Sequence, residues 1–159
     1  MFYAHSITTN RFTAAAGVGT SDSISIELSN VTGGTYSLAL IETVNVASND
    51  TANSIVLSGS KITTVNATGA QNLTLGSLPS AVATLDASAL TGTITATLTK
   101  TAGGTATGTA GKDAITGGAG ADTLIGGAGN DTITGDIGAD TINGQAGADI
   151  INPGAGADI

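Results

Sequence analysis

The sequence predicts an all-β protein, a right-handed parallel β-solenoid that continues into a second kind of parallel β-coil. Three observations support this prediction. The chain has 24 Gly but only two Tyr, two Phe and no Trp among its 159 residues, strand-like runs recur about every 20 residues, and a nine-residue Gly/Asp repeat fills the last third. So few large apolar residues cannot fill a compact globule, whereas thin layers of small residues can stack on one another.

Residues 1–20 carry no clear pattern, and we expect them to form an arm or a cap. The run 23–28 alternates Ser or Glu with Ile and Leu, which predicts a strand with one buried face. Val31, Thr32, Gly33 and Gly34 then predict a turn into a further strand that starts near Thr35.

Residues 21–107 are expected to form the solenoid. The runs 42–46, 63–67 and 83–87 align with one another as successive copies of a repeat, and each is followed by a second alternating run at 54–57, 72–75 or 93–98. Two strands in each copy predict one turn of a β-solenoid. The Thr/Ala/Gly stretch 99–107 looks like a junction, so the whole chain is expected to be one solenoid that changes its repeat near residues 100–108.

From residue 108 the chain repeats with a period of nine, in copies 108–116, 117–125, 126–134, 135–143, 144–152 and a partial copy 153–159. Glycines at positions one, two and four permit positive φ, so positions one to six predict a tight turn and positions seven to nine a short strand. Position eight is apolar and should face a thin core. Its residues are Ile115, Leu124, Ile133, Ile142 and Ile151.

Position six is Asp in all six copies. Because successive turns lie on alternate edges, the aspartates form two columns in which each member lies two nonapeptides after the one before it: Asp113, Asp131 and Asp149 in one, and Asp122, Asp140 and Asp158 in the other. Stacked strands lie about 4.8 Å apart, and carboxylates at that spacing repel by roughly 1 kcal/mol even in water. Calcium, which takes six to eight oxygen ligands, fits between such turns.

The net charge of −8 and the lack of any Lys or Arg after Lys112 argue against nucleic acid as a partner. No apolar run is long enough for a membrane span. With no Cys and one His, zinc is not favoured. The sequence has no His-Glu-x-x-His motif and no Gly-x-Ser-x-Gly motif, so we expect no enzymatic activity within this chain.

The nonapeptides resemble the repeats-in-toxin (RTX) pattern G-G-x-G-x-D-x-U-x, in which U is a large apolar residue. This resemblance implies a calcium-binding β-roll in which each ion lies between two turns on one edge. Carbonyls of positions two and four and the Asp come from one turn, and carbonyls of positions one and three and the Asp from the next. The implied ligand sets are Thr109, Gly111, Asp113, Gly126, Ala128 and Asp131 for the first site; Gly118, Gly120, Asp122, Gly135, Ile137 and Asp140 for the second; Gly127, Gly129, Asp131, Gly144, Ala146 and Asp149 for the third; and Asp136, Gly138, Asp140, Pro153, Ala155 and Asp158 for the fourth.

Some positions depart from the motif. Thr109 and Lys112 alter the first copy, Asp136 and Gln145 replace the second Gly and should strain their turns, and Pro153 replaces a first Gly. We expect calcium-coupled folding of residues 108–159, with an affinity of about 10⁻⁴–10⁻³ M, the range of extracellular calcium modules.

A Thr/Ala/Gly-rich solenoid that leads into such repeats resembles bacterial S-layer proteins of the RTX type, and the runs 40–46 and 85–93 add to that resemblance. It implies a homo-oligomeric lattice held by calcium on the bacterial cell surface, export by a type I secretion system, and a cell-surface polysaccharide as a further partner. The alternatives are a secreted adhesin or filament subunit, and the secretion module of an exported enzyme. Because the chain ends within a repeat, we also expect it to be a fragment.

Overall fold

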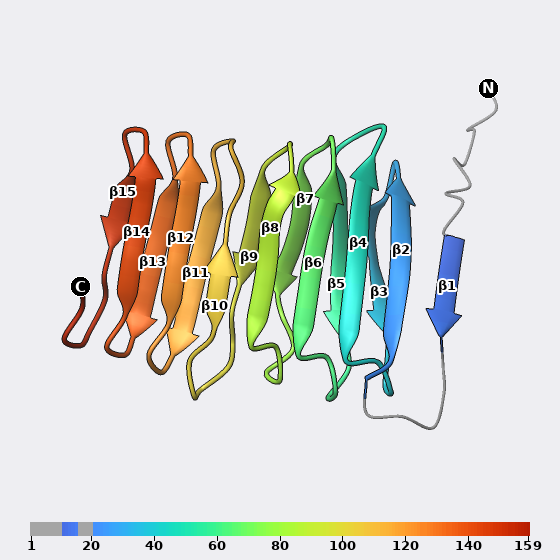
Figure 1. The fold of residues 1–159 in the computed structure, drawn as a ribbon, viewed down its shortest axis with the longest axis horizontal. Coiled ribbons are helices and arrows are strands. Elements are labelled where there is room, and N and C mark those ends of the chain that lie inside the picture. The colour runs from blue at the N-terminus through green and yellow to red at the C-terminus, as the bar shows by residue number, and fades with distance from the viewer. Residues whose placement is uncertain (1–10, 16–20) are drawn as a thin grey trace.

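The computed structural model describes residues 11–15 and 21–159, and this part of the chain contains strands and turns but no helix. Figure 1 shows the strands side by side along one axis, from β1 at one end to β15 at the other. They are β1 (Arg11–Ala15), β2 (Ser23–Ser29), β3 (Thr32–Ser37), β4 (Thr43–Asn49), β5 (Asn53–Ser58), β6 (Thr64–Gly69), β7 (Leu73–Ser77), β8 (Thr84–Leu90), β9 (Ile94–Thr97), β10 (Thr105–Thr107), β11 (Ala114–Ala119), β12 (Thr123–Ala128), β13 (Thr132–Ile137), β14 (Thr141–Ala146) and β15 (Ile150–Asn152).

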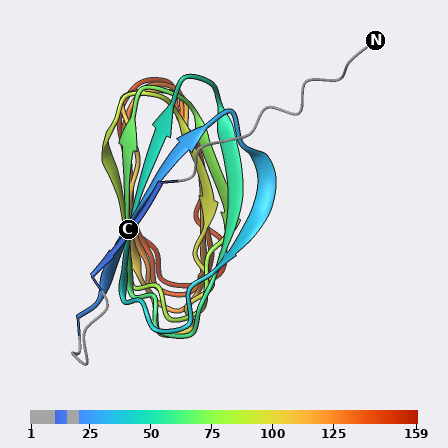
Figure 2. The same cartoon turned by 90° about the vertical axis from the view of Figure 1, so that its right-hand side faces the viewer.

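The strands form two facing sheets. The eight-stranded sheet has the order β1-β2-β4-β6-β8-β10-β12-β14, and the seven-stranded sheet has the order β15-β13-β11-β9-β7-β5-β3. Every pairing is parallel except β1 with β2, which is antiparallel. Viewed along the axis, the sheets enclose a flattened interior (Figure 2). The predicted parallel β-solenoid is therefore confirmed.

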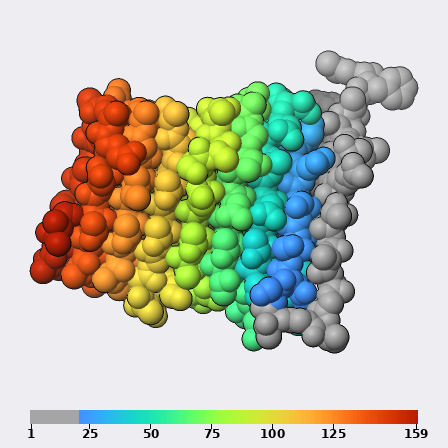
Figure 3. Space-filling view, in the orientation of Figure 1, coloured from blue at the N-terminus to red at the C-terminus, as the bar shows by residue number. Residues whose placement is uncertain are grey.

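The length of one turn changes along the coil. Thr43 aligns with Thr64, Thr64 with Thr84, and Thr84 with Thr105, so a turn takes about 20 residues in this region. Thr105 aligns with Thr123, which aligns in turn with Thr141, so a turn there is shorter and matches two nonapeptides. Figure 3 shows the successive turns as continuous bands with no break between the two regions. One solenoid thus changes its repeat after β10.

Inward-pointing apolar residues form one continuous core. In the solenoid region they alternate with polar residues along each strand, as in β4, where Val44 and Val46 are fully buried. In the nonapeptide region the core is one residue deep: Ile115, Leu124 and Ile133 are buried, as predicted for position eight. Ile142 is partly buried, whereas Ile151 is 43% exposed. The core therefore thins toward β15.

Two local predictions were wrong. The nonapeptide strands β11 to β14 have six residues each and run on through positions one to three of the next copy. Positions two and three pair with their counterparts one full turn later, as Gly118 does with Asp136, which extends each strand and confines the turn to positions four to six. The pair Gly33 and Gly34 forms an irregularity inside β3 rather than a turn, because the chain already turns at Asn30, where φ is 59°.

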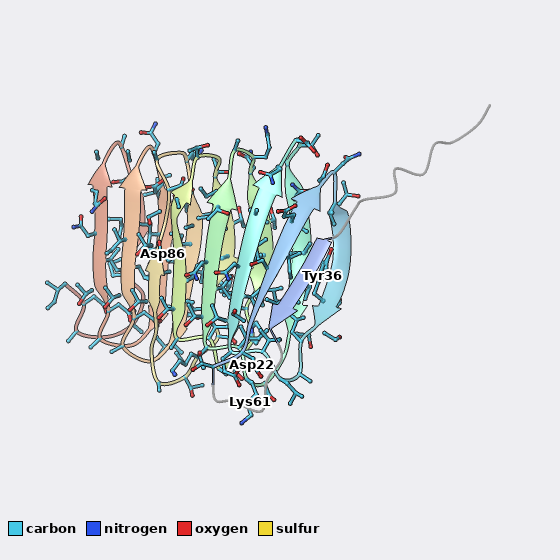
Figure 4. The ribbon with its side chains drawn as sticks, turned by 45° about the vertical axis from the view of Figure 1, so that its right-hand side comes forward. Asp22, Tyr36, Lys61 and Asp86 are labelled. Atoms are coloured by element: carbon cyan, nitrogen blue, oxygen red, sulfur yellow. The ribbon has the colours of Figure 1, made fainter. Side chains whose placement is uncertain are left out.

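The outer face of the eight-stranded sheet carries a polar ladder. Asn45 aligns with Asn66, and Asn66 aligns with Asp86. The Asn66 amide donates a hydrogen bond of 2.8 Å to Oδ1 of Asn45, whereas Oδ1 of Asp86 accepts the N–H of Ser88. Hydrogen bonds with Ser88 lower the pKa of Asp86, which lies exposed on β8 (Figure 4). Asp86 therefore aligns with the ladder but forms its hydrogen bonds within its own strand.

The expected arm or cap at residues 1–20 is described only in part. β1 pairs with β2 along the edge of the eight-stranded sheet, and residues 1–10 and 16–20 lie outside the described residues.

Candidate calcium sites

Each nonapeptide Asp lies two residues after the position-four glycine, and every one except Asp158 directly precedes a strand, which places the aspartates at the edges of the coil. Asp113, Asp122, Asp131 and Asp140 are 0–1% exposed, and Asp149 and Asp158 are partly exposed. Neighbouring strands pair with an offset of two nonapeptides, so the aspartates stand in the two predicted columns. Carboxylates are rarely buried to this degree without a cation or several hydrogen bonds.

A backbone amide separates successive aspartates in each column. Oδ1 of Asp131 accepts the N–H of Asp113 at 2.9 Å, and Oδ1 of Asp140 accepts the N–H of Asp122 at 2.8 Å. Oδ1 of Asp149 and of Asp158 continue this pattern at 2.9 and 3.0 Å. The sequence argument considered only repulsion between the carboxylates and missed these amide bonds, which the repeat spacing alone cannot reveal.

The second carboxylate oxygen divides the aspartates into two groups. Oδ2 of Asp113 accepts the N–H of Thr109 at 2.6 Å, and Oδ2 of Asp122 accepts the N–H of Gly118 at 2.9 Å. Oδ2 of Asp131 and Oδ2 of Asp140 are buried without a hydrogen-bond partner, and no other buried side-chain nitrogen or oxygen in residues 21–159 lacks one. A buried carboxylate oxygen without a donor is costly, and a cation removes that cost.

Position-one glycines make room for oxygens rather than for positive φ, which occurs at positions two and four. A Cβ on Gly117 would lie 2.5 Å from the carbonyl oxygen of Gly135 and 2.7 Å from Oδ2 of Asp122, so only glycine fits. The same kind of oxygen pair, an Asp Oδ2 and a backbone carbonyl oxygen, faces three other position-one glycines. The pairs come from Asp113 and Gly126 at Gly108, from Asp131 and Gly144 at Gly126, and from Asp140 and Pro153 at Gly135. The structure thus brings together two members of every predicted ligand set.

Several other predicted ligands also hold neighbouring turns together. The position-three carbonyls of Ile137, Ala146 and Ala155 accept the position-four N–H of the turn below at 2.7, 2.7 and 2.9 Å. The position-two carbonyls of Thr109 and Asp136 accept N–H groups of the turn above. A carbonyl oxygen has two lone pairs, so these groups keep one lone pair for an ion.

The donor set suits a hard cation. Residues 21–159 contain no cluster of three or more His, Cys, Asp or Glu side chains that could hold a metal, so an ion here would rely on backbone carbonyls and no more than two carboxylates. Oxygen-only coordination of this kind fits calcium and not zinc. Burial raises the pKa of both Asp113 and Asp122 despite their hydrogen bonds, and the charges of Asp131 and Asp140 add to this effect.

Backbone strain appears where the motif departs from glycine. Asp136 and Gln145 stand at position two with φ of 78° and 66°. Side chains other than Gly rarely adopt this conformation, so the strain expected at these two positions is confirmed.

The fold and the sites define a parallel β-roll that is continuous with a β-solenoid and is lined by paired oxygens at its edges. Residues 107–142 and 125–159 match the family model described as RTX calcium-binding nonapeptide repeat (4 copies). These repeats together with the solenoid support an RTX β-roll protein, and such repeats occur in secreted extracellular proteins. Searches of curated proteins and of solved structures gave no match. In the described part of the chain, no helix is suited to crossing a membrane.

Proposed function

We propose that this chain is a calcium-binding structural segment of a bacterial cell-surface protein and that it acts as a subunit of an S-layer-type lattice. Extracellular calcium would enter the spaces between turns, fix the nonapeptide roll, and allow subunits to assemble laterally. Export by a type I secretion system, attachment to a surface polysaccharide and a lattice of identical copies belong to this proposal.

The buried Oδ2 atoms of Asp131 and Asp140 are the observation that carries the calcium proposal. Both lie in the interior without a donor, and each faces a carbonyl oxygen of the turn above, from Gly144 and Pro153. Two oxygens that face one small space repel each other unless a cation lies between them. Around Asp131 and Asp140 the turns would supply the remaining carbonyl ligands without moving, because their backbone is already held by hydrogen bonds between neighbouring turns.

Two features favour a structural role over an enzymatic one. The solenoid strands β2 to β9 present mainly Ser, Thr and Asn outward, with Glu27 and Asp86 as exposed carboxylates, and their buried residues are almost all apolar. The buried carboxylates are all nonapeptide aspartates. We therefore assign no catalytic role to this chain. An adhesin or filament subunit, or the secretion module of an exported enzyme, would use the same calcium sites.

Calcium titration of the chelator-treated chain, followed by circular dichroism and electron microscopy, tests the proposal. We expect binding near 10⁻⁴–10⁻³ M, a gain of β-signal, and extended sheets after calcium is added. Fibres would support the filament subunit instead, and monomers the secretion module. A chain that binds no calcium at millimolar concentration would contradict all three.

A further inference from the structure

In this subsection a turn of the roll means the segment from position two to the Asp at position six. These turns fall into two conformations that differ at position two. Gly127, Asp136, Gln145 and Gly154 have positive φ of 116°, 78°, 66° and 96°. Thr109 and Gly118, in the first two copies, do not have positive φ. The first turn on each edge therefore has a shape different from that of the turns stacked above it.

This difference decides whether the Asp of the same turn is capped. Where φ is not positive, the position-two N–H points at the Asp and donates to its Oδ2, at 2.6 Å in the Thr109 turn and 2.9 Å in the Gly118 turn. Where φ is positive, Oδ2 of Asp131 and of Asp140 is left without a donor. We refer to the two shapes as capped and uncapped turns.

The uncapped shape requires an unfavourable backbone conformation at two positions. Asp136 and Gln145 adopt positive φ although they are not glycine. Strain of this kind persists only where the surrounding structure imposes it, and it gathers at functional sites. The uncapped shape is therefore the one that presents an oxygen to an ion.

Thr109 holds the first turn in the capped shape in two ways. Its Oγ1 donates to Oδ1 of Asp113 at 2.9 Å and accepts the N–H of Gly111 at 2.9 Å, and the side chain is only 4% exposed. With the N–H of Ile94 also bound to Oδ1, Asp113 receives three hydrogen bonds from the protein. Thr is also β-branched, and such residues are outliers at positive φ.

Gly118, by contrast, leaves the second turn free to change shape. It has no side-chain hydroxyl for Asp122, whose Oδ1 is bound only by the N–H of Gly104. Glycine adopts positive φ as readily as negative φ. The second turn can therefore uncap when an ion arrives, while the first cannot.

We propose that Thr109 closes the first of the four predicted sites and replaces its calcium ion with protein donors. The first roll turn then stays folded on the solenoid without calcium, and the ions fill only the second, third and fourth spaces. This inference rests on the calcium binding proposed above and concerns how many ions bind and where the first one binds.

Isothermal titration of calcium chloride into the chelator-treated full chain tests the number of calcium ions that bind. We expect three ions for the native chain and four for Thr109→Gly, which removes the hydroxyl and permits positive φ. Thr109→Val should keep three, because the β-branch remains, and Ala110→Gly is the matched control for added flexibility at an exposed neighbour. A native chain that binds four ions, or a Thr109→Gly chain that gains none, would overturn the inference.

Amide hydrogen exchange of the native chain in excess chelator, resolved by residue with NMR, gives a second measurement that needs no variant. The N–H groups of Thr109 and Gly111 should exchange at least tenfold more slowly than that of Gly127. Equal exchange at the three amides would refute the calcium-free first turn. If the native chain binds no calcium at all, the proposed function itself fails, whereas binding with an unchanged count defeats only the role of Thr109.

Discussion

The solenoid region and the nonapeptide region both bond neighbouring turns to each other at the edge of the coil, but they use different side chains. In the solenoid, Oδ1 of Asn53 accepts the N–H of Val31 one turn below, at 2.7 Å. In the roll, Oδ1 of Asp131 accepts the N–H of Asp113 one turn below, at 2.9 Å. Both oxygens thus tie two turns together.

The difference lies in the second half of the side chain. Nδ2 of Asn53 lies within hydrogen-bond distance of the carbonyl oxygens of Leu28, Asn49 and Thr51 and of the Ser48 hydroxyl, at 2.7–3.4 Å. The corresponding atom of Asp131 is an oxygen that faces another oxygen. An amide brings its own donors and makes the turn self-sufficient, whereas a carboxylate makes the turn depend on a cation. The comparison therefore predicts that the nonapeptide region responds to calcium and that the solenoid region does not.

Removal of calcium should give the largest effect. In excess chelator we expect the uncapped turns after residue 125 to lose protection against hydrogen exchange, while the solenoid strands keep theirs. Each ion that binds at several times its dissociation constant stabilises the fold by roughly 1 kcal/mol, and this contribution disappears with the metal. Equal loss of protection in both halves would contradict the comparison.

Asn53→Asp should place a buried carboxylate, like those of the roll, at an edge of the solenoid. The variant loses the buried donors and sets a carboxylate against several acceptors, so we expect a loss of about 3 kcal/mol in the free energy of unfolding without calcium. Calcium should restore part of this loss, as measured by urea denaturation with and without the ion.

Asn72→Asp is the matched control for that variant. Asn72 is exposed, and its Oδ1 accepts the N–H of Thr93, a bond that a carboxylate can also accept. We expect little change in unfolding. If both variants lost the same stability, burial and the amide donors of Asn53 would not explain its role.

Asp131→Asn tests the opposite exchange. It replaces the uncapped oxygen of the third site with an amide, so we expect one fewer calcium ion and a weaker midpoint by about tenfold, or ~1.4 kcal/mol. Calorimetric titration provides the measurement. Asp50→Asn serves as the control, because Asp50 is exposed, lies in the solenoid region, and has a φ of 63°, which an Asn also tolerates. An unchanged ion count in Asp131→Asn would exclude Asp131 as a ligand.

The smallest effect concerns pH in the metal-free chain. Burial raises the pKa of Asp113 and Asp122 above their unfolded values, so the folded form holds protons more tightly. Their contribution to stability is therefore complete below the unfolded pKa and is lost as the pH rises through the raised pKa. Thermal unfolding in chelator should shift upward on acidification, and less so in Asp122→Asn. A downward shift would contradict this sign.

The periodicities of the sequence predicted the solenoid, the alignment of 42–46 with 63–67 and 83–87, and the two aspartate columns, because side-chain spacing directly reports which residues stack. The strand extension through positions one to three and the capping of Asp113 and Asp122 could not be predicted, since both depend on φ at single residues and on backbone N–H directions. Thr109 was recognisable only as a departure from the motif. That its hydroxyl binds Asp113 required the three-dimensional arrangement.

The reversed strand β1 and the glycine irregularity in β3 have a shared consequence for solubility. A sheet edge with free N–H and C=O groups is a template for joining other chains. At this end of the coil β1 is the edge strand of one sheet and runs antiparallel to its neighbour, and the register shift between Thr32 and Thr35 interrupts the regular ladder at the edge of the other sheet. Neither edge strand therefore continues the regular parallel ladder of the coil, which disfavours the stacking of other chains in the same register.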